Sequence, residues 1–206
     1  MPERFHPAIR VLHWTMALLI LAMLFIGVAM VSTAGSAYTS LIALHRPIGI
    51  MVLLLAAIRL TIRFRTDAPP LPADLPRAQQ RAARGSHILL YLAMIGLPLI
   101  GWAMLSAGGY PVRLSANLVL PPILPQDLLA YGLLRRAHSI VAFAFFALIL
   151  GHLTIALVHG FVRRDGVLAT MIFPKQPAPD EATWDEAAEQ SSPADPREEA
   201  AATPVA

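Results

Sequence analysis

The residues of this chain with the greatest capacity for chemistry are its histidines. There are seven: His6, His13, His45, His87, His138, His152 and His159. All except His6 lie within a long apolar run or at its edge. A single histidine at the end of a membrane helix can simply reach the interface, but ionisable groups at membrane depth are costly and usually mark function. Six such positions favour ligation, because imidazole is a common ligand for metals and for haem iron.

Two of these histidines, His138 and His152, share one apolar run and lie fourteen positions apart. On an α-helix this separation corresponds to about 21 Å of rise and about 40° of rotation. The helix would therefore present two imidazoles on one face, one near each membrane surface. His45 falls at the same depth as His138, on the side that the basic residues, described below, predict to be the outer one. It is therefore the evident partner of His138. The pattern predicts two cofactors stacked across the bilayer.

The inner site has more than one possible composition. It has to include His152 or His159, together with His13 or His87. We favour His13 with His152.

The choice between a metal ion and haem depends on which other side chains in the chain could act as ligands. The chain has no cysteine, and its apolar runs contain no carboxylate. Two histidines alone would leave zinc or copper under-coordinated, whereas a haem brings four nitrogen ligands of its own. Two b-type haems, held without covalent attachment because no Cys-x-x-Cys-His motif is present, are the expected cofactors.

The elements that position these histidines are long apolar helices. The chain is 56% hydrophobic and 14% charged, against about 45–50% and about 25% in soluble domains. Four apolar runs, at roughly 11–30, 41–62, 88–105 and 137–158, each approach the length of about 20 residues that a membrane span needs. The sequence predicts an all-α integral membrane four-helix bundle over residues 1–174.

The composition changes after residue 174. Residues 175–206 consist largely of Pro, Ala and acidic residues, which predicts an acidic disordered tail. Nucleic-acid binding is not expected, because the basic residues do not form a patch on a polar surface.

The basic residues also predict an orientation in the membrane. Ten of them flank one side of the four runs and four flank the other. The four are Arg46, counted with the first connection, and Arg113, Arg135 and Arg136 in the connection over 106–136. The positive-inside rule then places both termini in the cytoplasm.

Several short motifs give the chain a family resemblance. They are Ile9-Arg10-Val11-Leu12-His13-Trp14, Leu44-His45 with Gly49 and Arg59, Ser86-His87, Gly96-Leu97-Pro98-Leu99-Ile100-Gly101, His138, Gly151-His152, and His159 with Arg163-Arg164-Asp165-Gly166. With these motifs, residues 4–174 resemble the bacterial cytochrome b561 family of di-haem membrane cytochromes.

The resemblance implies a ligand set and a function. It implies that His13 and His152 hold a cytoplasmic-side haem, that His45 and His138 hold an outer haem, and that electrons are exchanged with the quinone pool. Some members resemble superoxide oxidases, which pass an electron from periplasmic superoxide to ubiquinone. Others are haem-bearing membrane anchors of dehydrogenases or hydrogenases, and both readings stay open. A transporter or channel without a cofactor is the third and least favoured hypothesis, because inverted repeats and membrane-embedded acids are lacking.

The roles of the remaining polar residues have alternatives. Arg135 and Arg136 stand where members of the family often carry an acid; they would steer superoxide by their charge, or bind lipid headgroups or haem propionates. His87 and His159 would contact a quinone or a propionate, or simply lie at a helix end near the interface. Arg59 would balance a propionate or a lipid phosphate.

Overall fold

The computed structural model describes residues 5–66, 75–115 and 117–172. The elements, in chain order, are α1 (Pro7–Ser32), α2 (Ser36–Arg65), α3 (Arg77–Ala107), β1 (Val112–Arg113), β2 (Val119–Leu120), α4 (Leu128–Leu157), a π-helical turn (Val158–Arg163) and α5 (Ala169–Ile172). The predicted tail over 175–206 lies outside the described residues.

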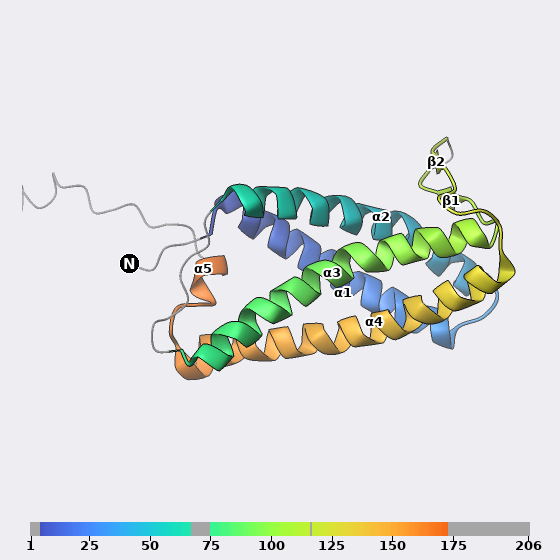
Figure 1. Ribbon diagram of the computed structural model, residues 1–206. Helices are drawn as coiled ribbons and strands as arrows, with labels where there is room; N and C mark the ends of the chain where they lie inside the picture. The colour runs from blue at the N-terminus through green and yellow to red at the C-terminus, as the bar shows by residue number, and fades with distance from the viewer. Residues whose placement is uncertain (1–4, 67–74, 116, 173–206) are drawn as a thin grey trace, which may run out of the picture. The chain divides into compact units, whose positions relative to one another are not determined.

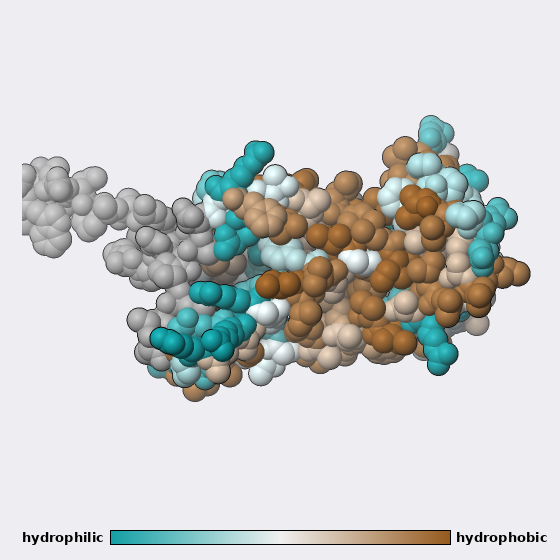
Figure 2. Space-filling model, viewed as in Figure 1, coloured by the Kyte–Doolittle hydropathy of each residue, from teal (hydrophilic) through white to brown (hydrophobic). Residues whose placement is uncertain are grey.

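Within the described residues, the four long helices are each long and apolar enough to cross a membrane. They pack as a bundle in which α1 lies against α2 and α3 against α4 (Figure 1). Apolar surface covers the middle of the helices and hydrophilic surface gathers at both ends (Figure 2). The predicted all-α membrane bundle is confirmed.

The helices are longer than the predicted apolar runs. Their ends are set by capping residues and by helix-forming residues that lie beyond the apolar stretch. In α1, Pro7 occupies the first turn, where its missing N–H costs nothing. In α4, the Asp127 side chain accepts a hydrogen bond from the Ala130 N–H at 2.9 Å and caps the helix. α4 therefore begins at Leu128, well before the predicted residue 137.

The observed bounds of α4 and α2 correct the predicted positions of three arginines. Arg135 and Arg136, which we placed in the connection over 106–136, lie inside α4. Arg46, which we counted with the first connection, lies inside α2.

The connection between α3 and α4 folds over one end of the bundle. β1 and β2 pair antiparallel, with Val112 opposite Leu120. We call this end the hairpin end. The other end carries the start of α1 and the short helix α5, and we call it the α5 end (Figure 1).

The bundle core is a thin apolar layer between these ends. Its buried residues are Met16, Ala56, Met94 and Phe145, one from each long helix. Phe145 lies midway along α4 between His138 and His152. The layer therefore separates the two depths at which the histidines were predicted.

Candidate functional site

Two histidines face each other at the hairpin end. The rings of His45 on α2 and His138 on α4 have centroids 6.2 Å apart and planes inclined by 67°. Both Nδ1 atoms are buried and have no hydrogen-bond partner. On α3, a Cβ at Gly101 would lie 3.4 Å from Cε1 of His138, so this glycine leaves room for the ring. We call His45 and His138 the hairpin-end pair.

Three histidines meet at the α5 end. The ring of His152 on α4 lies 6.4 Å from that of His13 on α1 and 5.6 Å from that of His87 on α3. We call these three the α5-end cluster. The structure thus brings together the predicted pair of His13 and His152, and it places the alternative partner, His87, nearer to His152 than His13 is.

These separations can be compared with the geometry of a metal held between two imidazoles. Two metal–nitrogen bonds of about 2 Å place the ligating nitrogens about 4 Å apart, and about 1 Å more on each side reaches the ring centres, which gives about 6 Å in total. The hairpin-end pair has this separation, and its free Nδ1 atoms can carry the proton that ligation through Nε2 requires. Both separations at the α5 end also lie near this value, so distance alone does not choose between His13 and His87. The residues fit haem at both depths.

Arg59 on α2 joins the α5-end cluster. Its guanidinium donates hydrogen bonds to Nδ1 of His13 at 2.9 Å and to the Tyr91 hydroxyl at 3.1 Å. A cation therefore lies directly beside one candidate ligand. Tyr91, on α3, was not singled out from the sequence, because a tyrosine in an apolar run carries no particular signal.

The structure pairs His159 with Asp165. It lies in the π-helical turn, and its Nδ1 is hydrogen-bonded to the carboxylate of Asp165 at 2.5 Å. Asp165 also accepts hydrogen bonds from Arg163 Nε at 3.0 Å and from the Val167 N–H at 3.3 Å. Burial raises the pKa of Asp165, but the hydrogen bonds from His159, Val167 and Arg163 outweigh it, and the net pKa is lowered.

Arg135 and Arg136 are exposed on α4 within one turn of His138. The guanidinium of Arg135 donates a hydrogen bond to the Tyr131 hydroxyl at 3.5 Å. Their exposure leaves both charges available to solvent or to lipid headgroups.

Arg46 was missed as a site residue. It follows His45 directly on α2, and its Nε atom is buried without a hydrogen-bond partner. The signal was present in the sequence, as a cation next to a candidate ligand in an apolar run, but we read it only as a charge for the orientation rule.

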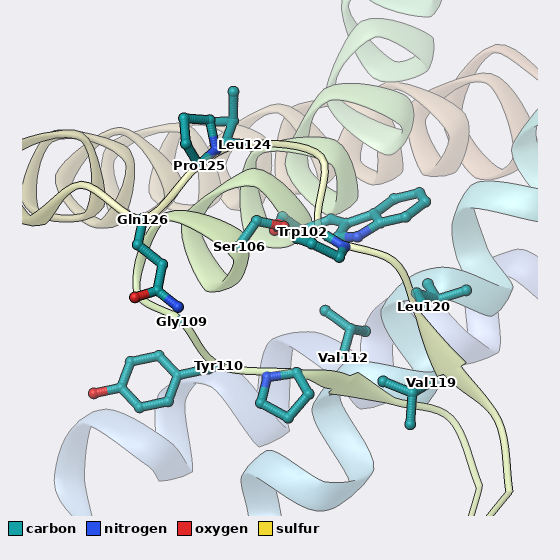
Figure 3. A pocket seen from close by; sticks show the side chains of 12 residues that line it. Trp102, Ser106, Gly109, Tyr110, Val112, Val119, Leu120, Leu124, Pro125 and Gln126 are labelled. Carbon is teal, nitrogen blue, oxygen red and sulfur yellow. The ribbon is translucent and has the colours of Figure 1, made fainter.

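A cavity of about 350 Å³ lies under the hairpin connection (Figure 3). Trp102 forms one wall, and its Nε1 donates a hydrogen bond to the Pro121 carbonyl at 3.0 Å. Ser106 accepts a hydrogen bond from the Ile123 N–H at 3.1 Å, which fixes the connection to α3. Trp102 directly follows Gly101 on α3, and neither His45 nor His138 lines the cavity.

A helical membrane bundle with facing histidines at two depths has the architecture of a membrane haem protein. The sequence model of the prokaryotic cytochrome b561 family matches residues 4–174, and the chain belongs to this family. The chain is therefore a multi-pass bacterial membrane protein and a b-type cytochrome that functions in electron transfer.

Curated relatives agree with this assignment. Cytochrome b561 homolog 2 of Escherichia coli (strain K12) is 28% identical over 174 residues, which cover 83% of this chain and 92% of that protein. Cytochrome b561 homolog 1 of the same organism is 29% identical over 164 residues, covering 78% of this chain and 92% of that protein. The probable superoxide oxidase CybB of Yersinia pestis is 28% identical over 166 residues, covering 78% and 91% respectively.

Proposed function

We propose that the chain holds two b-type haems and carries electrons across the bacterial inner membrane from superoxide in the periplasm to ubiquinone. His45 and His138 are the proposed axial ligands of the outer haem, and His13 and His152 those of the inner haem. The single observation that carries the proposal is the pair of imidazole separations, 6.2 Å and 6.4 Å, at two depths of one bundle. Each bound haem supplies a one-electron carrier.

The proposed direction rests on the distribution of charge. With both termini in the cytoplasm, the hairpin end faces the periplasm and the α5 end faces the cytoplasm. Superoxide is an anion, and the exposed Arg135 and Arg136 lie beside the outer pair. The overall reaction balances when two superoxide ions lose one electron each to become oxygen, and one ubiquinone gains two electrons and two protons to become ubiquinol.

The quinone site is proposed at the α5 end, in a groove of about 460 Å³. The groove lies between the start of α1 and α5, and Trp14 forms part of its wall. The Trp14 ring centroid is 5.4 Å from that of His13, and its Nε1 donates a hydrogen bond to the Met171 carbonyl at 3.1 Å. Trp14 and Val11 are 49% and 66% exposed, so the groove opens toward lipid, where ubiquinone is dissolved. Contacts of His87 and His159 with a quinone stay predictions.

A stopped-flow experiment tests the whole proposal. Purified protein, mixed with a superoxide flux, should show rapid reduction of both haems, and added ubiquinone should reoxidise them. A reduced-minus-oxidised spectrum without b-haem bands would refute the cofactor assignment. Haems that superoxide leaves oxidised would refute the donor while keeping the electron-carrier role.

The groove has its own test. Trp14→Phe keeps the aromatic ring but removes the donor to Met171, and we expect it to slow haem reoxidation by ubiquinone without changing haem reduction. Trp102→Phe at the hairpin end is the matched control. Equal slowing in both variants would exclude a quinone site in this groove.

A second candidate function, a haem-bearing anchor and electron-transfer subunit for a dehydrogenase or hydrogenase, is favoured by one surface feature. Leu128 and Leu129, at the start of α4, are 86% and 72% exposed and lie farther out than Arg135. Exposed apolar side chains beyond the membrane core are typical of a protein contact. Under this alternative, superoxide would not reduce the isolated chain, and a soluble redox partner would co-purify in stoichiometric amount only when Leu128 and Leu129 are intact.

A further inference from the structure

The polar groups left unpaired inside the bundle are concentrated at one place. Among the described residues, the buried side-chain nitrogens without a hydrogen-bond partner are Nδ1 of His45, Nδ1 of His138 and Nε of Arg46. All three belong to the hairpin-end pair or to the residue next to it. Buried polar groups are normally satisfied, and an unsatisfied one calls for an explanation.

The buried Nε of Arg46 is the most demanding of the three. A histidine can adjust its tautomer or ligate iron, but a guanidinium stays protonated, has no acceptor and does not bind a metal cation. A charge at membrane depth is usually paired. Arg46 follows His45 directly on α2, so an acceptor for its buried Nε has to lie at the level of the hairpin-end pair.

The spanning helices cannot provide that partner from their own carboxylates. The sequences of α1, α2, α3 and α4 contain neither Asp nor Glu. Asp127, just before α4, is engaged with the Ala130 N–H as the helix cap. Among the described residues no carboxylate is paired with Arg46, so the candidate partner is an anion from outside this part of the chain.

The equivalent cation at the other end does not have this problem. Arg59, on the same helix, donates to both Tyr91 and His13. α2 thus places Arg46 at the depth of the hairpin-end pair and Arg59 at the depth of the α5-end cluster. Of these two arginines, only Arg46 has a buried nitrogen without a hydrogen-bond partner.

We infer that Arg46 is a positioning residue that pairs with a propionate carboxylate of the haem held by the hairpin-end pair. This inference rests on the proposed function, because it requires a haem between His45 and His138. Reduction lowers the positive charge on the iron, so a fixed cation nearby favours the reduced state. Arg46 therefore raises the reduction potential of the outer haem and fixes the direction in which its propionates point.

The test is a spectroelectrochemical titration of the purified full chain in neutral detergent, with Arg46→Gln and Arg46→Lys. We expect Arg46→Gln to lower the outer midpoint potential, with about a tenfold change in the reduction equilibrium, which is 59 mV for a one-electron couple. Arg46→Lys should restore most of the shift. Arg113→Gln is the matched control, because it removes the same charge from an exposed position on the same end.

The haem content of each variant separates the possible outcomes. If Arg46→Gln loses one haem of two while Arg113→Gln keeps both, the inference also stands, because the pairing then contributes to binding. Two retained haems with unchanged potentials in Arg46→Gln would overturn it. A shift of equal size in Arg113→Gln would overturn it too, because the effect would then be one of general surface charge.

Two further measurements distinguish a haem propionate from a lipid phosphate, and failure of the inference from failure of the proposed function. If the effect of Arg46→Gln appears only after phosphatidylglycerol is added, the partner is a lipid phosphate and the inference is wrong. If the unmodified protein holds no haem between His45 and His138, as judged by an unchanged haem content in His138→Leu, the proposed function fails first. With that haem present, an absent effect of Arg46→Gln refutes only the role of Arg46.

Discussion

Arg59 donates a hydrogen bond to Nδ1 of His13 at 2.9 Å, and this contact fixes the tautomer of the ring. A guanidinium has only donors, so Nδ1 has to accept, and the neutral ring then carries its proton on Nε2. Ligation through Nε2 requires the opposite tautomer. If His13 ligates the proposed inner haem through Nε2, Arg59 has to leave Nδ1, and its charge then becomes available to a propionate.

The first prediction concerns that exchange. Arg59→Gln should lower the midpoint potential of the inner haem by an amount comparable to a tenfold change in the reduction equilibrium, about 59 mV. Tyr91→Phe, which removes the other partner of Arg59 without changing charge, should shift it much less. Redox titration of the two variants checks this, and equal shifts would show that packing around Tyr91, rather than charge, is responsible.

The second prediction separates the two possible partners of His152. We expect His13→Ala to reduce the haem content from two per chain to one, and His87→Ala to retain both. The pyridine haemochrome assay measures this ratio. The reverse pattern would make His87, whose ring is 5.6 Å from that of His152, the axial ligand.

The third prediction uses the close approach of Gly101 to His138. Gly101→Leu should displace the ring and abolish haem binding at the hairpin end, because even a Cβ would lie 3.4 Å from Cε1 of His138. Gly96→Leu is the control on the same helix, since a Cβ there meets nothing within 4 Å. Loss of the same haem in both variants would indicate a general disturbance of α3.

The fourth prediction tests electrostatic steering. The double variant Arg135→Gln/Arg136→Gln should lower the second-order rate constant for haem reduction by superoxide about tenfold at low salt, with a smaller difference at about 1 M salt, where charges are screened. Stopped-flow spectroscopy over a salt series measures both. A rate that is unchanged, with altered lipid binding instead, would assign these arginines to headgroups.

The fifth prediction concerns the hydrogen bonds of Asp165. Its pKa is lowered in the folded protein from an ordinary value of 3.8. A carboxyl group with a depressed pKa stabilises the fold above its unfolded pKa, and this contribution is lost as pH falls through the folded value. Asp165→Asn should therefore lower the melting temperature at pH 7 by about 2–4 °C. The difference from the unmodified protein should shrink below pH 3.8; a constant difference across the titration would contradict the ionic origin.

The features that could be predicted from the sequence depend on local rules. Span length and helix periodicity place His138 and His152 at two depths on one face without any knowledge of packing, and depth alone then suggests the pairing with His45. The start of α4 at Leu128 was missed because it depends on the cap at Asp127, whereas apolarity marks only the central part of the helix.

The remaining features depend on contacts between helices. That His87 lies nearer to His152 than His13 does is a result of how α3 crosses α4, which periodicity does not describe. The hydrogen bond of His159 to Asp165 depends on a π-helical turn, which ordinary helix periodicity does not predict. The unpaired nitrogen of Arg46 follows from burial between helices, and only a structure can reveal it.

The apolar layer of Met16, Ala56, Met94 and Phe145 has an electrical consequence. Its four buried side chains carry no ionisable group, so in the proposed route an electron passes between the two levels without a proton carrier among them. Moving a full charge across the membrane potential requires about 2.3 kcal/mol per 100 mV, and in the proposed direction, from periplasm to cytoplasm, the negative charge moves toward the negative side. Electron transfer through this bundle should therefore slow as the cell becomes more energised and quicken when the membrane is depolarised.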